Sequence, residues 1–441
     1  MKQMAIFRYP TAIIGLLIIM GLFVLAGYAL TQYTYDEAVA LWRGDENTWA
    51  ETPRNAIPKW LNMLQGNKLP ETIKISTLEN PHIKERIDYE YYAVVTTEMT
   101  FDYQYDAFPS ELAVFYTSPT DGERPFVTAY WDTPDGRSIE LEARSINPTQ
   151  RVYLGMDQNL QKLYGNTPVE IGLFMDPNAE TPTVLKGQYK LRLEGYLFDD
   201  VSDVDAKLVV YGKVHGWAGT DHRRRDMMVA LLFGTPIALA FGFLAALGST
   251  LTTFFISAVG AWYGRWVDAL IQRITEVNMI LPSLPILIMV GTLYSRNIWV
   301  ILGVVILQGI FGGSVKTYRS IFLQTKSAPY IDAARVYGAG NARLIFRYMI
   351  PRIIPVLIPS FVTLIPTYVF LEASLALLGL GDPVLPTWGK LLQDAGENGA
   401  LFRGYYYWIA QPAALLMLTG LGFAMVGFAL DRIYNPRLRG Q

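Results

Sequence analysis

The sequence predicts an α-helical polytopic membrane protein, with about six transmembrane helices, that carries an inserted mainly-β domain. The chain has 441 residues, is 51% hydrophobic and has a mean hydropathy of +0.21, which is typical of an integral membrane protein. Residues 33–215 hold 29 acidic and 17 basic side chains and no apolar run that could cross a bilayer, whereas the other residues hold 10 acidic and 20 basic. An acidic, aqueous insert therefore interrupts a basic membrane body.

Residue types that carry common enzyme chemistry are scarce in this chain. The absence of cysteine excludes disulfides, iron–sulfur clusters and thiol catalysis. The histidines are His82, His215 and His222, which argues against a histidine-based metal centre. The sequence has no nucleotide-binding glycine loop, no G-x-S-x-G and no H-E-x-x-H. We therefore expect no catalytic residue, no metal site and no cofactor bound by this chain, and we interpret the acids of the insert as a solvated surface rather than a calcium or catalytic site.

An apolar run near the N-terminus is the first predicted span. It covers Thr11–Leu30, and about twenty residues are enough to cross a bilayer core of roughly 30 Å. A cleaved signal peptide is the alternative, but its apolar region usually has only about 7–15 residues, so a retained anchor is favoured. Lys2 and Arg8 precede the run, which predicts a cytoplasmic N-terminus. Residues 1–32 are thus read as a cytoplasmic tail and transmembrane helix 1.

Residues 33–214 are predicted to form the β-rich insert. A segment with Trp42, Trp49 and Trp60 is expected to be partly helical, and alternating apolar and polar residues after it predict strands with one wet face. Turn clusters such as 119–122 and 133–136 separate the strands, and this spacing is typical of a β-sandwich. Because one span precedes them, residues 33–220 are expected to be extracytoplasmic. The predicted strands are Tyr89–Tyr105, Glu111–Tyr116, Phe126–Trp131, Ser138–Glu142, Val169–Phe174, Tyr189–Phe198 and Ala206–Val214.

Residues 215–441 are predicted to be the membrane core, whose expected spans are Met228–Trp262, Val277–Leu293, Ile298–Phe311, Ile353–Leu378 and Tyr407–Leu430. The first could be two spans or one long tilted helix, and we choose one. Both termini and residues 263–276 and 312–352 then lie in the cytoplasm, and these cytoplasmic segments carry 14 Lys and Arg against four acids. The positive-inside rule supports this topology, although residues 223–225, three arginines, remain outside.

The segment 327–351 is too polar to lie in lipid, yet strongly apolar sequences flank it. Pro329 fits the first turn of a short helix, Gly338 and Gly340 interrupt the helical pattern, and Asn341 can cap a second helix that ends at Pro351. Residues 332–334, Asp-Ala-Ala, give the first helix a face of small residues. A plain cytoplasmic loop is the alternative, but the pattern favours a compact hairpin that inserts into a groove of a partner.

Glu372 stands in an otherwise apolar helix, where a charge costs at least about 2.5–3.5 kcal/mol near the middle of the bilayer. One interpretation is a pathway or gate residue, and the other is a helix–helix hydrogen bond near a partner subunit. Small residues around it would let another helix approach closely.

Several of these segments together resemble a known family. Asp332-Ala333-Ala334, Gly338, Ile350 and Pro351 resemble the EAA-type coupling motif of ATP-binding-cassette (ABC) importer permeases, with Asp in place of the usual Glu. Residues 219–226, 372–381, 386–389 and 435–437 are similar to the GTDxxGRD, EAxLSFLGLG, PTPSWG and DPR elements of one branch, the second permease of the oligopeptide, dipeptide and nickel importers.

The resemblance assigns expected roles to two groups of residues. ATPase coupling is implied for Tyr330, Asp332, Ala333, Ala334, Gly338, Ala339, Gly340 and Pro351. Family-motif positions are Gly219, Thr220, Asp221, Arg225, Asp226, Gly379, Gly381, Trp388 and Gly389.

The resemblance also implies a type I ABC importer permease fold in a prokaryotic plasma membrane. The expected partners are a second, different permease subunit, two ABC ATPases that use ATP and Mg, an extracytoplasmic solute-binding protein and membrane lipid, without nucleic acid. The chain itself would hydrolyse nothing, so it is not expected to be an enzyme. Residues 330–341 would transmit the closure of the ATPase dimer to the spans, a coupling between a nucleotide state and two membrane conformations.

This sequence departs from the family pattern in places. Arg224 replaces the glycine of the GRD element, Gly216 replaces a proline, one residue is inserted between His215 and Gly219, and the family has only a short segment in place of residues 33–214. The insert could be a docking platform for the binding protein or a lid that substitutes for part of it. Alternatives for the whole protein are an ABC-type export permease and a membrane-anchored extracytoplasmic binding or sensor protein, and the solute could be a peptide, a nickel chelate or an oligosaccharide.

Overall fold

A computed structural model describes residues 9–44, 47–64, 66, 68–141, 143–199 and 201–434. Lys2, Arg8, the predicted strand end at Glu142 and the motif at 435–437 lie outside the described residues. The chain divides into two compact units, one formed by residues 1–43 with 229–441 and the other by residues 44–228.

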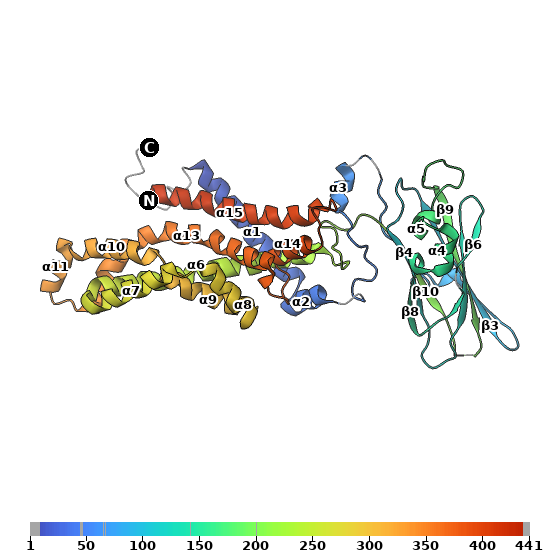
Figure 1. Cartoon of the computed structure of the whole chain (residues 1–441), viewed down its shortest axis with the longest axis horizontal. Helices are drawn as coiled ribbons and strands as arrows, with labels where there is room; N and C mark the ends of the chain where they lie inside the picture. Colours follow the sequence, from blue (N-terminus) through green and yellow to red (C-terminus); the bar gives the residue numbers. More distant parts are fainter. Residues whose placement is uncertain are drawn as a thin grey trace. The chain divides into compact units, whose positions relative to one another are not determined.

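The unit of residues 44–228 contains two antiparallel sheets, which confirms the predicted β-rich insert (Figure 1). One sheet has the order β1-β10-β4-β8, and the other has the order β2-β3-β9-β5-β6, with β7 paired to β5. The strands are β1 Ile73–Ser76, β2 Lys84–Asp88, β3 Ala93–Tyr103, β4 Glu111–Thr117, β5 Phe126–Asp132, β6 Ser138–Glu140, β7 Arg144–Ser145, β8 Thr149–Tyr153, β9 Gly187–Leu197 and β10 Asp205–Tyr211. The helices are α3 Lys59–Leu64, α4 Gln158–Tyr164 and α5 Val169–Gly172, with 3-10 turns at Pro81–Ile83 and Leu154–Met156.

Side chains from both sheets enter one hydrophobic core. Burial alternates along β3 and β9, whose register runs from Ala93 opposite Leu197 to Tyr103 opposite Gly187. The ring of Phe174 lies at the centre of an aromatic cluster, 4.5 Å from Tyr189 and 4.7 Å from Tyr103 between centroids. Rings at these separations attract each other beyond the area that they bury.

The predicted strand at Val169–Phe174 is wrong, because this segment begins as helix α5. The carbonyl of Pro168 accepts bonds from the N–H groups of Ile171 and Gly172, which closes a helical turn. The helical arrangement buries Val169, Leu173 and Phe174 together. A short, mainly apolar segment of six residues fits the period of a helix as well as that of a strand. Only its packing in the surrounding core decides between the two.

Four strands, β1, β2, β7 and β8, were not predicted, and the predicted strand 89–105 is shorter, as β3. β2 is exposed along most of its length, so it shows no alternation of apolar and polar residues. Residues 89–92 make the turn between β2 and β3, where the N–H of Tyr89 donates to the carbonyl of Tyr92 over 2.8 Å. In the predicted tryptophan segment, Trp42 lies in α2 of the other unit and Trp60 in α3.

The other unit consists of helices, in agreement with the predicted polytopic fold. They are α1 Pro10–Gln32, α2 Tyr35–Arg43, α6 Met227–Tyr263, α7 Arg265–Ile280, α8 Ser283–Leu293, α9 Ile298–Ile310, α10 Ser314–Lys326, α11 Pro329–Val336, α12 Asn341–Arg343, α13 Ile350–Leu375, α14 Trp388–Glu397 and α15 Tyr406–Tyr434. π-helical turns at Leu344–Met349 and Ala376–Leu380 flank α13. α1 runs beside α15 (Figure 1), and Gly15 and Gly422 allow the close approach.

Within the described residues, four helices are long and apolar enough to cross a membrane, and counting each of two bent pairs as one span gives six. α6 is a single helix of 37 residues, which confirms the choice of one span for 228–262. The span predicted at Val277–Leu293 lies within a bent pair of helices, because α7 and α8 meet at 77°. Pro282 lacks an N–H and disfavours a helical Leu281, so the helix breaks there. α9 and α10, bent by 44°, form the second pair.

Candidate functional site: a hairpin and two motif junctions

The predicted hairpin is present at one end of the membrane unit, where α11 is followed by a tight turn and α12. Pro329 is in the first turn of α11, as predicted, and Gly338 ends the helix with φ of +79°. The second helix differs from the prediction, because Gly340 rather than Asn341 is the N-cap residue and the helix does not end at Pro351. It continues through α13, since the wide π turn before Pro351 accommodates a residue without an N–H donor.

One face of α11 packs on the helical bundle. Ile331 and Ala334 are buried in a cluster with Trp262 of α6, Phe322 of α10 and Met349. The predicted face of small residues is therefore divided, because Ala334 points inward whereas Ala333 and Asp332 are exposed. Only Ala333 of the two alanines is available to a partner.

Ion and cation–π contacts join the hairpin region to the end of α6. The Nζ of Lys326 donates to the carbonyls of Ala261 and Trp262 over 3.0 and 2.7 Å. A cation at these terminal carbonyls stabilises the helix end. Lys326 lies 5.5 Å and Arg335 5.4 Å from the centroid of the Trp262 ring, within the range of a cation–π contact. Arg335 of α11 thus contacts the end of α6 through Trp262.

A second link joins α10 to α7. The guanidinium of Arg319 binds both carboxylate oxygens of Asp268, and the bond from Nε is 2.6 Å long. Bidentate pairs of this kind fix the orientation of both groups.

The sequence analysis missed the most exposed apolar residues of the hairpin. Val336 is 87% exposed and Tyr337 is 91% exposed, at the end of α11 beside Gly338. The sequence pattern that could have identified them is an apolar pair directly before a glycine in a polar segment. We call Val336 and Tyr337 the hairpin tip. Apolar groups fully open to water at a turn mark a surface for a partner.

Glu372 and the glycine and tryptophan motifs meet in one junction, apart from the hairpin cluster. Glu372 is 6% exposed and lies beside Thr387. Gly379 has φ of +84° and turns the chain after the π-helical end of α13. Gly389 packs against Ala373 and Ala376, and Gly381 also faces Ala376. Both interpretations of Glu372, as a pathway or gate residue and as a helix–helix hydrogen bond near a partner subunit, stay predictions.

Trp388 anchors this junction to α6. It is fully buried, and its Nε1 donates to the carbonyl of Leu231 over 3.0 Å. Gly234 leaves the room that the indole occupies. Asp382 accepts the N–H of Ile298 over 3.0 Å, so it holds the start of α9 against the same junction.

The GTD and RD residues form a buried polar turn in the unit of residues 44–228. The Thr220 hydroxyl donates to the carbonyl of Pro53 and accepts the N–H of Ala56, over 2.7 and 2.9 Å. Asp221 accepts the Nε of Arg225 over 2.6 Å, and both side chains are almost fully buried. Asp226 accepts the N–H of Met228 over 2.8 Å, at the start of α6. Gly219 has φ of +79°, which an L residue rarely adopts.

Arg224, the departure from the motif glycine, keeps the glycine-like backbone with φ of +67°. Its guanidinium donates to the carbonyl of Thr52 over 2.8 Å, pairs with Glu111 of β4, and lies 4.5 Å from the ring centroid of Tyr211. The left-handed conformation is unfavourable for Arg by roughly 1–2 kcal/mol. The contacts of Arg224 with the β strands offset this unfavourable conformation. Arg224, in place of the motif glycine, thus joins the motif loop to the inserted domain.

Comparisons with known proteins agree with the resemblance. Residues 252–440 match the family described as the binding-protein-dependent transport system inner membrane component. The chain is 29% identical over 227 residues to the dipeptide transport system permease protein DppC of Alkalihalophilus pseudofirmus, covering 51% of this chain and 72% of that protein. Residues 252–440 of this chain are thus similar to the membrane component of such transport systems.

Other relatives have related names. The oligopeptide transport system permease protein OppC of Bacillus subtilis is 29% identical over 225 residues, 51% of this chain and 72% of that protein. The peptidoglycan transport system permease protein YejE of Agrobacterium fabrum is 28% identical over 223 residues, 50% of this chain and 57% of that protein. These similarities and the apolar helices support a multi-pass inner membrane protein of the permease type. The family match begins inside α6, so the inserted β domain lies outside it.

Proposed function

We propose that this permease forms half of the translocation path of an ATP-driven importer for short peptides or similar small solutes. The names of the relatives, dipeptide and oligopeptide permeases, support the solute class. The second half would come from a different permease subunit, and a solute-binding protein would deliver the peptide from outside. The fold would be that of a type I importer, with the two sheets of residues 44–228 forming a sandwich on the extracytoplasmic side and both termini in the cytoplasm.

The observation that carries the coupling role is the hairpin tip. Val336 and Tyr337 are exposed on a helix whose other face is fixed to the bundle by Ile331 and Ala334. A rigid knob with an apolar end fits a groove on a cytoplasmic ATPase, which would bind ATP and Mg itself. When the ATPases close, α11 would move as a body and pull on Trp262 at the end of α6.

The inserted domain would serve the delivery step. Of the two interpretations, a platform for the binding protein is favoured over a lid, because the contacts of Thr220 with Pro53 and of Arg224 with Glu111 hold the motif loop to the rest of this domain. A domain held together in this way presents a fixed surface to a protein.

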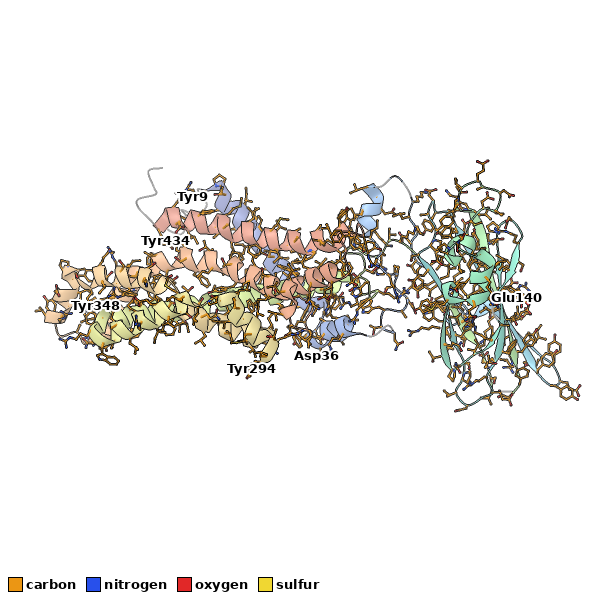
Figure 2. All side chains as sticks on the ribbon, in the orientation of Figure 1. Tyr9, Asp36, Glu140, Tyr294, Tyr348 and Tyr434 are labelled. Atoms are coloured by element: carbon orange, nitrogen blue, oxygen red, sulfur yellow. The ribbon has the colours of Figure 1, made fainter. Side chains whose placement is uncertain are left out.

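The test is co-purification and transport with the partner subunits. Val336→Ala with Tyr337→Ala should lower both co-purification of the ATPases and ATP-driven uptake of a labelled peptide into proteoliposomes by at least tenfold, since apolar hot-spot residues contribute about 2 kcal/mol or more each. Tyr294→Ala is the matched control, because Tyr294 is 80% exposed at the other end of the bundle (Figure 2). Wild-type co-purification by the double variant would contradict the docking role.

A further inference from the structure

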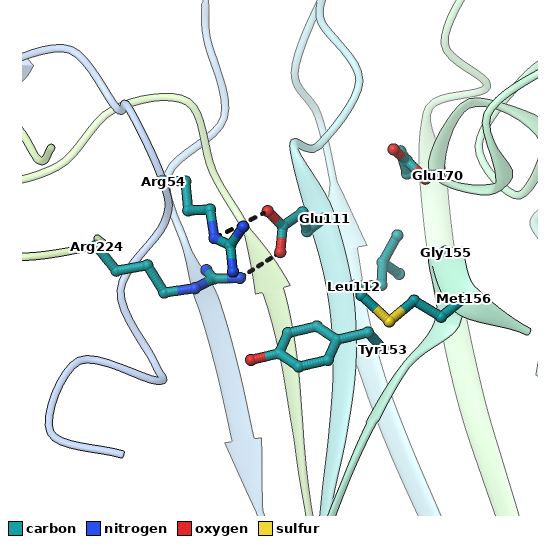
Figure 3. A pocket seen from close by; sticks show the side chains of 8 residues that line it. All are labelled: Arg54, Glu111, Leu112, Tyr153, Gly155, Met156, Glu170 and Arg224. Carbon is teal, nitrogen blue, oxygen red and sulfur yellow. Dashed lines mark hydrogen bonds and ion pairs between the residues drawn. The ribbon is translucent and has the colours of Figure 1, made fainter. Parts of the chain in front are cut away.

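The inserted domain contains a pocket that the permease function does not use. It has a volume of about 210 Å³, and every residue that lines it belongs to the unit of residues 44–228. Figure 3 shows the arrangement, with Arg54 and Arg224 on one side and Glu170 on the other. The lining residues are Arg54, Glu111, Leu112, Tyr153, Gly155, Met156, Glu170 and Arg224.

The arginine side of the pocket has an excess of positive charge. Glu111 pairs with Arg224, whose side chain is 3% exposed, and its other oxygen lies 3.9 Å from the Nε of Arg54. One carboxylate therefore faces two guanidinium groups. Arg224 is held by the Thr52 carbonyl and the Tyr211 ring as well, so it keeps Glu111 in place. The Arg54 side chain is 47% exposed and can turn toward a ligand while Glu111 stays paired.

The opposite side of the pocket carries a carboxylate without a positive partner. Glu170 is half-buried on α5, and within the described part of the chain no hydrogen bond or ion pair joins its carboxylate to another residue. Between the two sides lie Leu112 and Tyr153, with Met156 at the rim, 75% exposed. The pocket therefore has a positive end, an apolar middle and a negative end.

We propose that this pocket binds a short zwitterionic peptide, with the terminal carboxylate on Arg54 and the terminal ammonium on Glu170. This inference rests on the proposed function in one respect, the source of the ligand. A solute that is delivered to an importer from outside would pass this domain. A volume of 210 Å³ is below the roughly 300–1,000 Å³ of pockets for drug-sized ligands, so it fits a peptide of about two residues. The apolar middle would contact the peptide's side chains.

The charges select against other ligand classes. A simple anion would leave Glu170 close to a negative ligand, and a simple cation would face two arginines. A neutral sugar would desolvate both charged ends without pairing either, which is unfavourable. Only a ligand with opposite charges at its two ends satisfies both sides.

The test is calorimetric titration of the full-length permease in lipid nanodiscs with the dipeptide alanyl-phenylalanine. We expect binding, with affinity at least tenfold weaker for the N-acetylated and for the C-amidated dipeptide, because each lacks one charge-assisted bond. Glu170→Gln should weaken binding of the dipeptide about tenfold and remove the discrimination against the N-acetyl form. Arg54→Gln should do the same for the C-amide form, and Glu140→Gln, an exposed glutamate on β6, should bind as the wild type does.

Absence of dipeptide binding, equal binding of the blocked forms or wild-type affinity in both pocket variants would overturn the proposal. Neither pocket variant touches the buried Arg224 contacts, so loss of folding is not expected and a thermal unfolding curve checks it. Peptide uptake by the assembled transporter distinguishes failure of the pocket proposal from failure of the proposed transport function. Peptide uptake without pocket binding would refute this site alone, whereas absence of peptide uptake despite an assembled, ATP-hydrolysing complex would refute the proposed function.

Discussion

Gly338 allows the sharpest test of the coupling hairpin, because a substitution there changes the energy of the backbone conformation without causing a steric clash. Its φ is +79°, and a Cβ built on it would meet no heavy atom within 4 Å. A larger residue would therefore not clash with the bundle, and only the backbone conformation would be unfavourable. For an L residue this amounts to roughly 1–2 kcal/mol, and a β-branched side chain is a still greater outlier.

We expect Gly338→Val to reduce ATP-driven peptide uptake by at least tenfold, since 1.4 kcal/mol corresponds to a factor of ten in the population of the native turn. Expression and membrane insertion should be unchanged, because the turn is exposed. Gly338→Asn should retain most activity, as Asn tolerates the left-handed region. Uptake is measured in proteoliposomes that contain the permease, its partner and the ATPases.

Gly340 supplies the matched control two residues away. It also has no atom within 4 Å of a built Cβ, but its φ is −70° and its ψ is 162°, which any residue adopts. Gly340→Val should therefore transport nearly as the wild type does. Normal uptake by Gly338→Val, or an equal loss in Gly340→Val and Gly338→Asn, would refute the argument from backbone geometry.

Three further outcomes are expected. The chain has no cysteine, so a membrane-impermeant maleimide should label Ser138→Cys in intact cells but Ser327→Cys only after lysis, and the reverse pattern would contradict the proposed orientation. Arg224→Gly should lower the unfolding free energy by about 2 kcal/mol, because lost charge-assisted bonds outweigh the relieved backbone, and an unchanged thermal unfolding curve would contradict this. Burial lowers the pKa of His215 and raises that of Asp226, 3.8 Å away. The lowered pKa of His215 makes stability fall as pH drops through about 6.5, the unfolded pKa of His, whereas the raised pKa of Asp226 acts in the opposite direction. His215→Gln should therefore reduce the acid-side loss in a thermal unfolding series.

Strand prediction succeeded where one face of a sheet is buried and failed elsewhere. β9 was recognised because buried and partly exposed residues alternate along it, whereas β2 is exposed along most of its length and gives no such pattern. Phe174 illustrates the opposite error, since its apolar neighbours fit a strand as well as a helix. Its packing among Tyr103 and Tyr189 fixes the helical form.

For the membrane unit, hydropathy located the spans but not their bends. Pro282 is visible in the sequence, yet the angle of 77° depends on how α7 and α8 pack. Pro351 looked like a helix end, and the π turn before it allows the helix to continue. The Asp-Ala-Ala motif was found, but only packing shows that Ala334 faces the bundle while the neighbouring tip, Val336 and Tyr337, faces outward.

The sequence by itself determined the class of this protein, because hydropathy, charge asymmetry and short motifs are local properties that survive without a fold. It also located the hairpin, the insert and the departure at Arg224. Tertiary structure alone decided which side chains meet. The contacts of Trp262 with Lys326 and Arg335, of Trp388 with Leu231 and of Arg224 with Glu111 join residues far apart in the chain. Such pairings depend on the packing of whole elements, which no local pattern encodes.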